Sequence, residues 1–187
     1  MTNQILIEQG TAIVFGVTAS FAPADPGTQS AAAITAVLTL SAVADAAGRQ
    51  SDKVDLGAVR AAQYAVIGCV DYTGETPSAT GRTDYYWAPS TQNTQANGNV
   101  AGNSGADGAA PDGALGTITL AEFIKQCQII GSLATHDGAV VQNGYVGTFS
   151  PKERYGQLIV VNNGGDAYEA DDVEAHQVMV PIIDEIQ

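Results

Sequence analysis

The chain has 187 residues, and its 20 acidic against 7 basic side chains give a formal net charge of −13. Such a charge repels phosphate backbones and anionic membrane surfaces, and the sequence holds no basic cluster that would offset it. It also holds no run near the roughly 20 apolar residues of a membrane span, so we expect binding neither to nucleic acid nor to a membrane.

Apolar residues make up 45% of the chain, enough for a sizeable core, whereas charged residues make up only 14%, well below the roughly one quarter that is typical. We therefore expect a surface covered by uncharged polar and small residues, which favours packing beside identical neighbours. Residues 1–8 lack the basic start and the long apolar stretch of a secretory signal.

Residues 1–10 are predicted to form an N-terminal arm. Ile5, Leu6 and Ile7 are apolar, and Gly10 separates them from the next strand-like segment. We expect this arm to pair either with the sheet of its own chain or with that of a neighbouring subunit. Residues 11–187 are predicted to form a single domain, because all-β units often reach this size undivided.

Nine segments of the chain have the pattern of short strands. They are residues 11–18, 34–41, 50–56, 61–72, 83–88, 127–135, 139–149, 157–161 and 174–183. The apolar run in residues 157–161 is unbroken, which is typical of a strand covered on both faces. Frequent turns and the lack of βαβ alternation indicate a sandwich or a barrel, and we expect an all-β, antiparallel β-sandwich with long surface loops.

A long polar loop is predicted at residues 89–114, where Val100 is the only apolar side chain larger than alanine or proline. Such a composition cannot build a packed core. We therefore expect the loop either to lack fixed structure or to be held by contacts outside its own domain. Its two acids, Asp107 and Asp112, offer calcium ligands, although their spacing fits no EF-hand.

One short helix is predicted after this loop. Thr119 and Glu122 have the spacing of a capping box, in which the Thr hydroxyl and the Glu carboxylate accept free amides at a helix start. We expect one or two turns, through Ile124.

The ionisable residues suggest no catalytic set. His136 precedes Asp137, but no G-x-S-x-G nucleophile motif occurs, so a turn histidine is expected. His176 falls in a strand-like segment and is expected to be structural. The acidic residues Glu169, Asp171, Asp172 and Glu174 suit either cation binding or a solvated turn. We expect no enzymatic activity and no cofactor.

The aromatic and sulfur-containing residues have two interpretations each. Tyr85, Tyr86 and Trp87 offer stacking surfaces for a sugar or a base, but strand alternation places half of the cluster toward the core. Cys69 and Cys127 lie in apolar strand-like segments at a spacing that matches no metal motif. Buried free thiols are expected, and a disulfide is compatible with the sequence.

Two stretches of the sequence resemble structural proteins encoded by tailed bacteriophages. The first runs from TDYYWAPS at residues 83–90 through the Asn/Gly/Ala-rich loop that ends in SGADG at residues 104–108. The second joins GYVGTFSPKERYG at residues 144–156 to the segment VPIIDEIQ at residues 180–187. The resemblance spans roughly residue 50 onward and is weaker before it.

The resemblance implies a virion component with a jelly-roll-like sandwich and without catalytic residues. It leads us to expect a capsid decoration (cement) protein in the virion, assembled in the host cytoplasm and bound as a homo-oligomer, taken as a trimer, to the major capsid protein or other virion proteins. Ile5, Leu6, Ile7 and Val100 are the expected assembly contacts. The alternatives are a tail, collar or baseplate component, and a carbohydrate-binding module that would expose Tyr86 or Trp87 beside the long loop.

Overall fold

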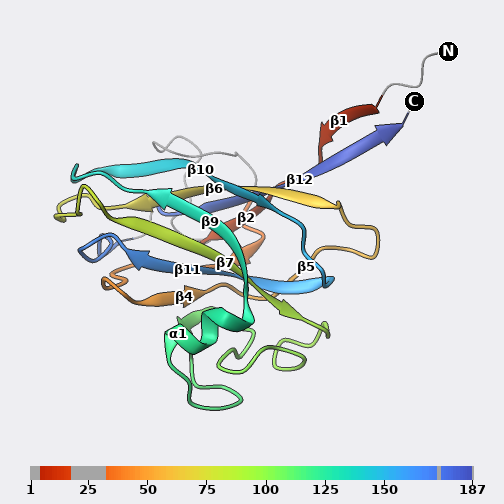
Figure 1. Ribbon diagram of the computed structural model, residues 1–187, viewed down its shortest axis with the longest axis horizontal. Helices are drawn as coiled ribbons and strands as arrows, with labels where there is room; N and C mark the ends of the chain where they lie inside the picture. Colours follow the sequence, from red (N-terminus) through yellow and green to blue (C-terminus); the bar gives the residue numbers. More distant parts are fainter. Residues whose placement is uncertain (1–4, 18–32, 172–173, 187) are drawn as a thin grey trace.

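The computed structural model describes residues 5–17, 33–171 and 174–186, which form two facing β-sheets and one short helix (Figure 1). This arrangement confirms the all-β sandwich. Twelve strands are described where nine were expected, because some predicted segments are divided and others are new. Among the described residues, no helix is long and apolar enough to cross a membrane.

The first sheet has the strand order β10-β6-β12-β2-β3, with β1 paired to β12. Its strands are β1 (Ile5–Gln9), β2 (Ile13–Gly16), β3 (Ala36–Val37), β6 (Gln63–Asp71), β10 (Val141–Phe149) and β12 (Gln177–Ile186). All pairs in this sheet are antiparallel except β2 with β3.

The second sheet has the order β8-β4-β11-β7-β9, with β5 paired to β11. Its strands are β4 (Gly48–Gln50), β5 (Val54–Asp55), β7 (Arg82–Ser90), β8 (Gly108–Ala110), β9 (Gln128–Ala134) and β11 (Tyr155–Asn163). Every pair is antiparallel. The central strand, β11, lies between β4 and β7 and contains the unbroken apolar run.

Strand β11 is covered on both faces, as its sequence predicts. Leu158 and Val160 belong to the main core between the sheets. Ile159 and Val161 belong to a second apolar cluster on the outer face of the second sheet, which also contains Phe123. All four side chains are buried.

The capping box is confirmed and begins a single helical turn, α1 (Leu120–Phe123). The Thr119 hydroxyl accepts the Glu122 amide, and the Glu122 carboxylate accepts the Thr119 amide at 2.8 Å. The helix continues as the 3-10 turn η1 (Ile124–Gln126). Its one fully buried side chain, Phe123, packs in the second apolar cluster.

The strand expected at residues 34–41 is shorter than predicted. Only Ala36–Val37 pair with another strand, although Leu38 and Leu40 farther along are buried in the core. The strand does not continue because the Thr39 amide donates to the Asp107 carboxylate at 2.8 Å and not to a backbone carbonyl of a neighbouring strand. The strand expected at residues 50–56 is likewise divided between β4 and β5, and residue 18 of the segment 11–18 lies outside the described residues.

Candidate functional site

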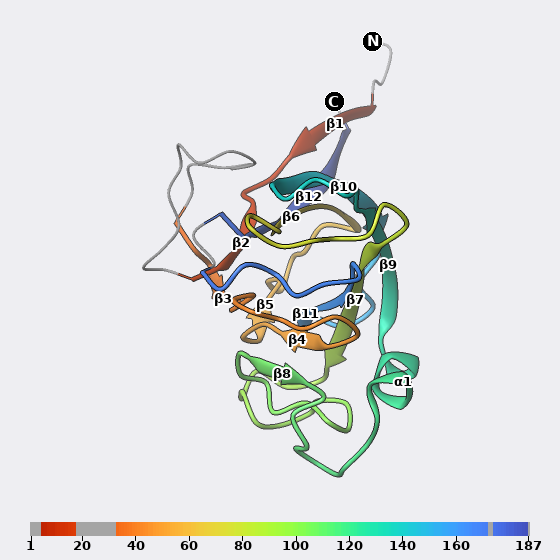
Figure 2. The ribbon, with the colours of Figure 1, turned by 90° about the vertical axis from the view of Figure 1, so that its left-hand side faces the viewer.

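A two-stranded ribbon projects from the sandwich, formed by β1 and the last four residues of β12 (Figures 1 and 2). The register places Ile5 opposite Ile186, Ile7 opposite Asp184 and Gln9 opposite Ile182. β6 pairs with β12 only as far as Ile182. We call residues 5–9 and 183–186 the terminal ribbon.

The terminal ribbon settles how the N-terminal arm is arranged within its own chain. Of the two expected pairings, β1 adopts the one with its own sheet, so it is not an unpaired strand. Ile5, Leu6 and Ile7, three of the expected assembly contacts, all lie in it. Their part in assembly remains a prediction.

An open hollow of about 410 Å³ lies at the base of the terminal ribbon. Its wall includes Ala12, Leu56, Val59, Arg60, Pro181 and Ile183. Val59 is 98% exposed and Ile183 is 42% exposed. The hollow is therefore a largely apolar surface at the point where the ribbon leaves the sandwich.

The loop between β7 and α1 covers the outer face of the second sheet, and we call residues 91–118 the loop platform. It contains β8, which pairs with β4. Val100 is half-buried and packs against the second apolar cluster rather than facing outward. The platform and the terminal ribbon lie at opposite ends of the molecule (Figures 1 and 2).

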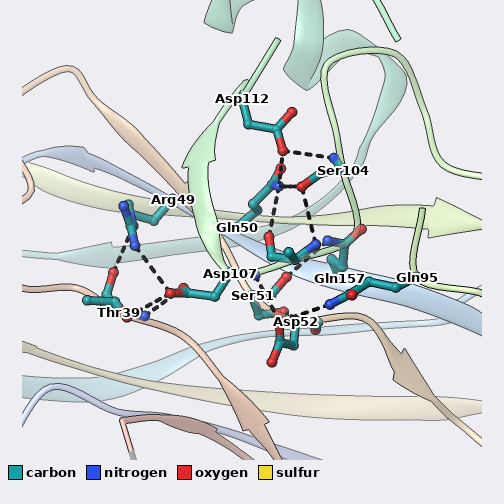
Figure 3. Close-up of polar contacts among 11 residues, drawn as sticks. Thr39, Arg49, Gln50, Ser51, Asp52, Gln95, Ser104, Asp107, Asp112 and Gln157 are labelled. Atoms are coloured by element: carbon teal, nitrogen blue, oxygen red, sulfur yellow. Dashed lines mark hydrogen bonds and ion pairs between the residues drawn. The ribbon is translucent and has the colours of Figure 1, made fainter. Parts of the chain in front are cut away.

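Polar side chains hold the loop platform on the sheet (Figure 3). The buried amide nitrogen Nε2 of Gln50 contacts Ser104 Oγ at 3.2 Å, the Ala106 carbonyl at 2.9 Å and Asp112 Oδ2 at 2.8 Å. Lys53 donates to three backbone carbonyls, those of residues 92, 94 and 97, at 2.8–3.1 Å. The expectation that the loop lacks contacts within its own domain is thus wrong, because hydrogen bonds replace apolar packing.

The two platform acids that were considered for calcium are bonded to protein donors. Asp107 accepts the Thr39 amide and hydroxyl at 2.8 and 2.7 Å and pairs with Arg49 at 3.4 Å. Asp112 accepts from Ser104, Gln50 and Ala114. Partial burial acts to raise the pKa of Asp112, but these hydrogen bonds outweigh it and hold the pKa below its ordinary value.

Among the buried polar atoms near the platform that have no hydrogen-bond partner within the described residues, three belong to almost completely buried side chains. They are Gln50 Oε1, Gln157 Oε1 and Asn103 Nδ2. All three side chains are at most 1% exposed. Groups of this kind are ordinarily bridged by buried water.

Among the described residues, one cluster of three carboxylate side chains has the spacing of a cation site. Oxygen atoms of Asp71, Asp171 and Glu174 lie within 4.8 Å of one another. Asp71 is buried at the end of β6 and also accepts the Thr73 amide at 2.7 Å. Carboxylate oxygens in such a group are ligands that Ca²⁺ accepts.

Sequence reasoning identified only part of this group. Asp171 and Glu174 belong to the acidic run, but Asp71 is distant in sequence and joins them through the fold, where the Glu169 amide donates to the Asp71 carbonyl at 2.9 Å. The Glu169 carboxylate accepts the Ala170 amide. Asp172 lies outside the described residues.

The histidines occupy structural positions. His136 is exposed in a turn, where its Nδ1 accepts the Gly138 amide at 3.0 Å. His176 is buried, and its Nδ1 lies 2.8 Å from the Glu174 carbonyl.

The aromatic cluster follows the predicted alternation. Tyr85 and Trp87 are fully buried in the main core, and the Tyr85 hydroxyl donates to Gln177 at 2.9 Å. Tyr86 is half-buried and packs against the second apolar cluster. The exposed aromatic surface that a sugar site would need is not formed by these residues.

Cys69 and Cys127 are both free thiols. Burial raises the pKa of each to about 12. Cys69 is in β6, as predicted, whereas Cys127 is half-buried directly before β9 rather than within it.

Comparisons with protein-family models, with curated proteins and with solved structures found no match for this chain.

Proposed function

We propose that this protein is a non-enzymatic structural component of a tailed-phage virion, and that it decorates the outer capsid shell in many copies. The observation that carries the proposal is the terminal ribbon, a projecting pair of strands on an otherwise compact sandwich. An isolated two-stranded ribbon is marginally stable in water, so its presence supports a role in protein–protein assembly.

The charge of the chain favours the outer shell over the particle interior. A net charge of −13 makes a place beside packaged DNA unfavourable. Few charged residues and many small polar ones suit repeated protein contacts. A tail, collar or baseplate position satisfies the same argument and is the alternative within this class. The carbohydrate-binding alternative is less favoured, because Trp87 is buried and Tyr86 is half-buried.

The test adds purified protein to undecorated, expanded shells of the phage that encodes it and counts bound copies. We expect saturation on the order of the number of shell subunits, because each symmetric repeat offers one equivalent site, together with a higher shell melting temperature. A chain lacking residues 1–9 should bind more weakly.

Two other outcomes have distinct meanings in this experiment. Binding of a few copies at one vertex would assign the protein to the tail. An absence of binding to shells, together with measurable affinity for a glycan, would overturn the decoration proposal. A matched control is the Leu115→Ser variant, which removes an exposed apolar side chain of the loop platform.

A further inference from the structure

Three asparagines of the chain are followed directly by glycine, at residues 97, 143 and 163. In this dipeptide the glycine amide nitrogen can attack the carbonyl carbon of the asparagine side chain, because glycine has no side chain to obstruct the approach. The attack closes a succinimide ring and releases ammonia. Whether it takes place in a folded protein depends on how freely the two reacting groups can move.

The fold restrains the reacting groups of two of these pairs. Asn143 and the glycine after it lie within β10 and pair with β6, so the ladder holds the backbone that ring closure must rotate. The Asn163 side chain donates to Asp84 Oδ2 at 2.8 Å. The amide of Gly164 donates to Asn162 Oδ1 at 2.9 Å. In both pairs the reaction therefore requires a local opening of the structure.

The third pair, Asn97 and Gly98, has both reacting groups free of hydrogen bonds within the described part of the chain. The Asn97 side chain is exposed on the loop platform. Neither its amide group nor the Gly98 backbone amide forms a hydrogen bond with a described residue. Gly98 has a φ of +70°, a conformation that disfavours any larger residue, so the backbone of the turn itself selects the residue that leaves the amide open to reaction.

The backbone carbonyl of Asn97, in contrast, is held by two hydrogen-bond donors. Lys53 Nζ lies 2.8 Å from its oxygen and Ser90 Oγ lies 3.2 Å from it. This carbonyl becomes one of the two carbonyls of the succinimide, and water must attack one of them to open the ring. Donors that stabilise a developing oxyanion speed attack at the carbonyl that they contact. Attack at the former backbone carbonyl is therefore favoured over attack at the former side-chain carbonyl.

We propose that Asn97 converts spontaneously to isoaspartate, directed by Lys53 and Ser90. The Gly98 nitrogen forms a bond to Asn97 Cγ, and the side-chain nitrogen leaves as ammonia with the proton of the Gly98 amide. Water then adds to the former backbone carbonyl, whose bond to the Gly98 nitrogen breaks, and that nitrogen regains a proton. The chain now runs through Cβ and Cγ, and the former backbone carbonyl has become a carboxylate.

The new carboxylate lies where the folded chain already places a cation. Lys53 pairs with no carboxylate among the described residues, and its ammonium donates to backbone carbonyls there. Conversion replaces one neutral acceptor by a charged one, which strengthens the hydrogen bond. The product keeps the loop platform fastened to the sheet and adds one negative charge to it. This modification goes beyond the proposed function and does not depend on shell binding.

The test incubates the unmodified chain in mildly alkaline buffer and follows the three pairs by peptide mapping. Mass spectrometry detects the mass increase that accompanies exchange of an amide for a carboxylate, and electron-based fragmentation distinguishes isoaspartate from aspartate. We expect Asn97 to convert at least about tenfold faster than Asn143 and Asn163, because these must wait for local opening. Conversion of either of them as fast as Asn97, or no conversion of Asn97, would overturn the proposal.

The ratio of isoaspartate to aspartate tests the role of Lys53. A synthetic peptide of residues 94–101 gives the ratio without the fold, and the folded chain should exceed it at least about twofold, because only the fold supplies the two donors. Lys53→Met should lower the ratio toward that of the peptide, whereas Lys125→Met, at an exposed position of η1, should leave it unchanged.

The comparison of the unmodified chain with the peptide needs no variant, so it remains decisive if Lys53→Met does not fold. Equal ratios in the chain and the peptide would refute the directing role of Lys53 and Ser90. A folded Lys53→Met variant with an unchanged ratio would refute it as well.

Discussion

Gly156 lies on β11 where an added methyl group would meet the indole ring of Trp87. Trp87 is fully buried beside Phe149, with ring centroids 5.6 Å apart, so the ring cannot move aside. We expect Gly156→Ala to reduce the free energy of unfolding by about 1–3 kcal/mol through overpacking.

Denaturant titration measures this loss, and Gly108→Ala is the control. The nearest atom to a methyl group at Gly108 is 4.0 Å away, so this change should stay within about 0.5 kcal/mol. Equal stability of the two variants would show that the core around Trp87 is looser than described.

The two thiols should react slowly with alkylating reagents in the folded protein. With a pKa of about 12 for both Cys69 and Cys127, only roughly one thiol in ten thousand is ionised at pH 8, and the thiolate is the reactive form. Mass spectrometry after timed labelling should show little modification until denaturant is added. Rapid labelling of either cysteine without denaturant would refute this.

At the scale of elements, the Asp112 carboxylate is one of the groups that hold the loop platform, and its hydrogen bonds favour its charged form. Because the pKa of Asp112 is lower in the folded protein, its contribution to stability is present above the unfolded value of about 3.9 and is lost as the pH falls through the folded pKa. The platform should therefore loosen below about pH 4.

Hydrogen exchange at pH 5 and pH 3, corrected for intrinsic rates, checks this expectation. The amides of Ser104 and Ala114, which donate to Asp112, should lose protection at the lower pH. Asp112→Asn should lose it at both pH values, whereas Asp137→Asn, in an exposed turn, should behave as the unmodified chain. Equal protection at pH 5 and pH 3 would contradict the role of Asp112.

Local patterns predicted those elements whose stability is mainly local or whose burial follows a simple period. The capping box at Thr119, the apolar run of β11 and the alternation of Tyr85 and Trp87 were all found as expected. These features depend on residues that are close together in the sequence, so a short stretch of sequence is enough to predict them.

Elements that depend on polar partners far away in the sequence could not be predicted from local patterns. β8 has only Gly and Ala, and it forms because β4 presents a free edge and Gln50 binds the surrounding loop. The approach of Asp71 to Glu174 also depends on residues more than 100 positions apart. Pairing of the arm with its own sheet was one of two expected arrangements, but the sequence did not identify β12 as the partner of β1. No periodicity in the sequence marks such contacts.

At the scale of the whole molecule, the excess of negative charge opposes the compact state. Three ion pairs are described, Arg49–Asp107, Arg82–Asp84 and Arg154–Asp55, but a net charge of −13 remains. Raising the salt concentration from 0.01 to 0.15 M shortens the screening length from about 30 to about 8 Å, so repulsion across the surface should fall more than attraction within the pairs.

We expect the melting temperature of the isolated chain to rise over this range of sodium chloride, as measured by circular dichroism. A double variant with Asp137→Asn and Glu153→Gln, both at exposed positions, should melt higher at low salt and respond less to added salt. A melting temperature that falls with salt would mean that the ion pairs dominate.

Trp87 is the only tryptophan of the chain, and the burial that makes Gly156 necessary also determines its emission. Its indole Nε1 has no hydrogen-bond partner among the described residues, and no part of its side chain reaches solvent. Intrinsic fluorescence should therefore be blue-shifted and insensitive to aqueous quenchers. It will report the separation of the two sheets but remain silent when the terminal ribbon or the loop platform moves, so each of those motions needs a fluorophore of its own.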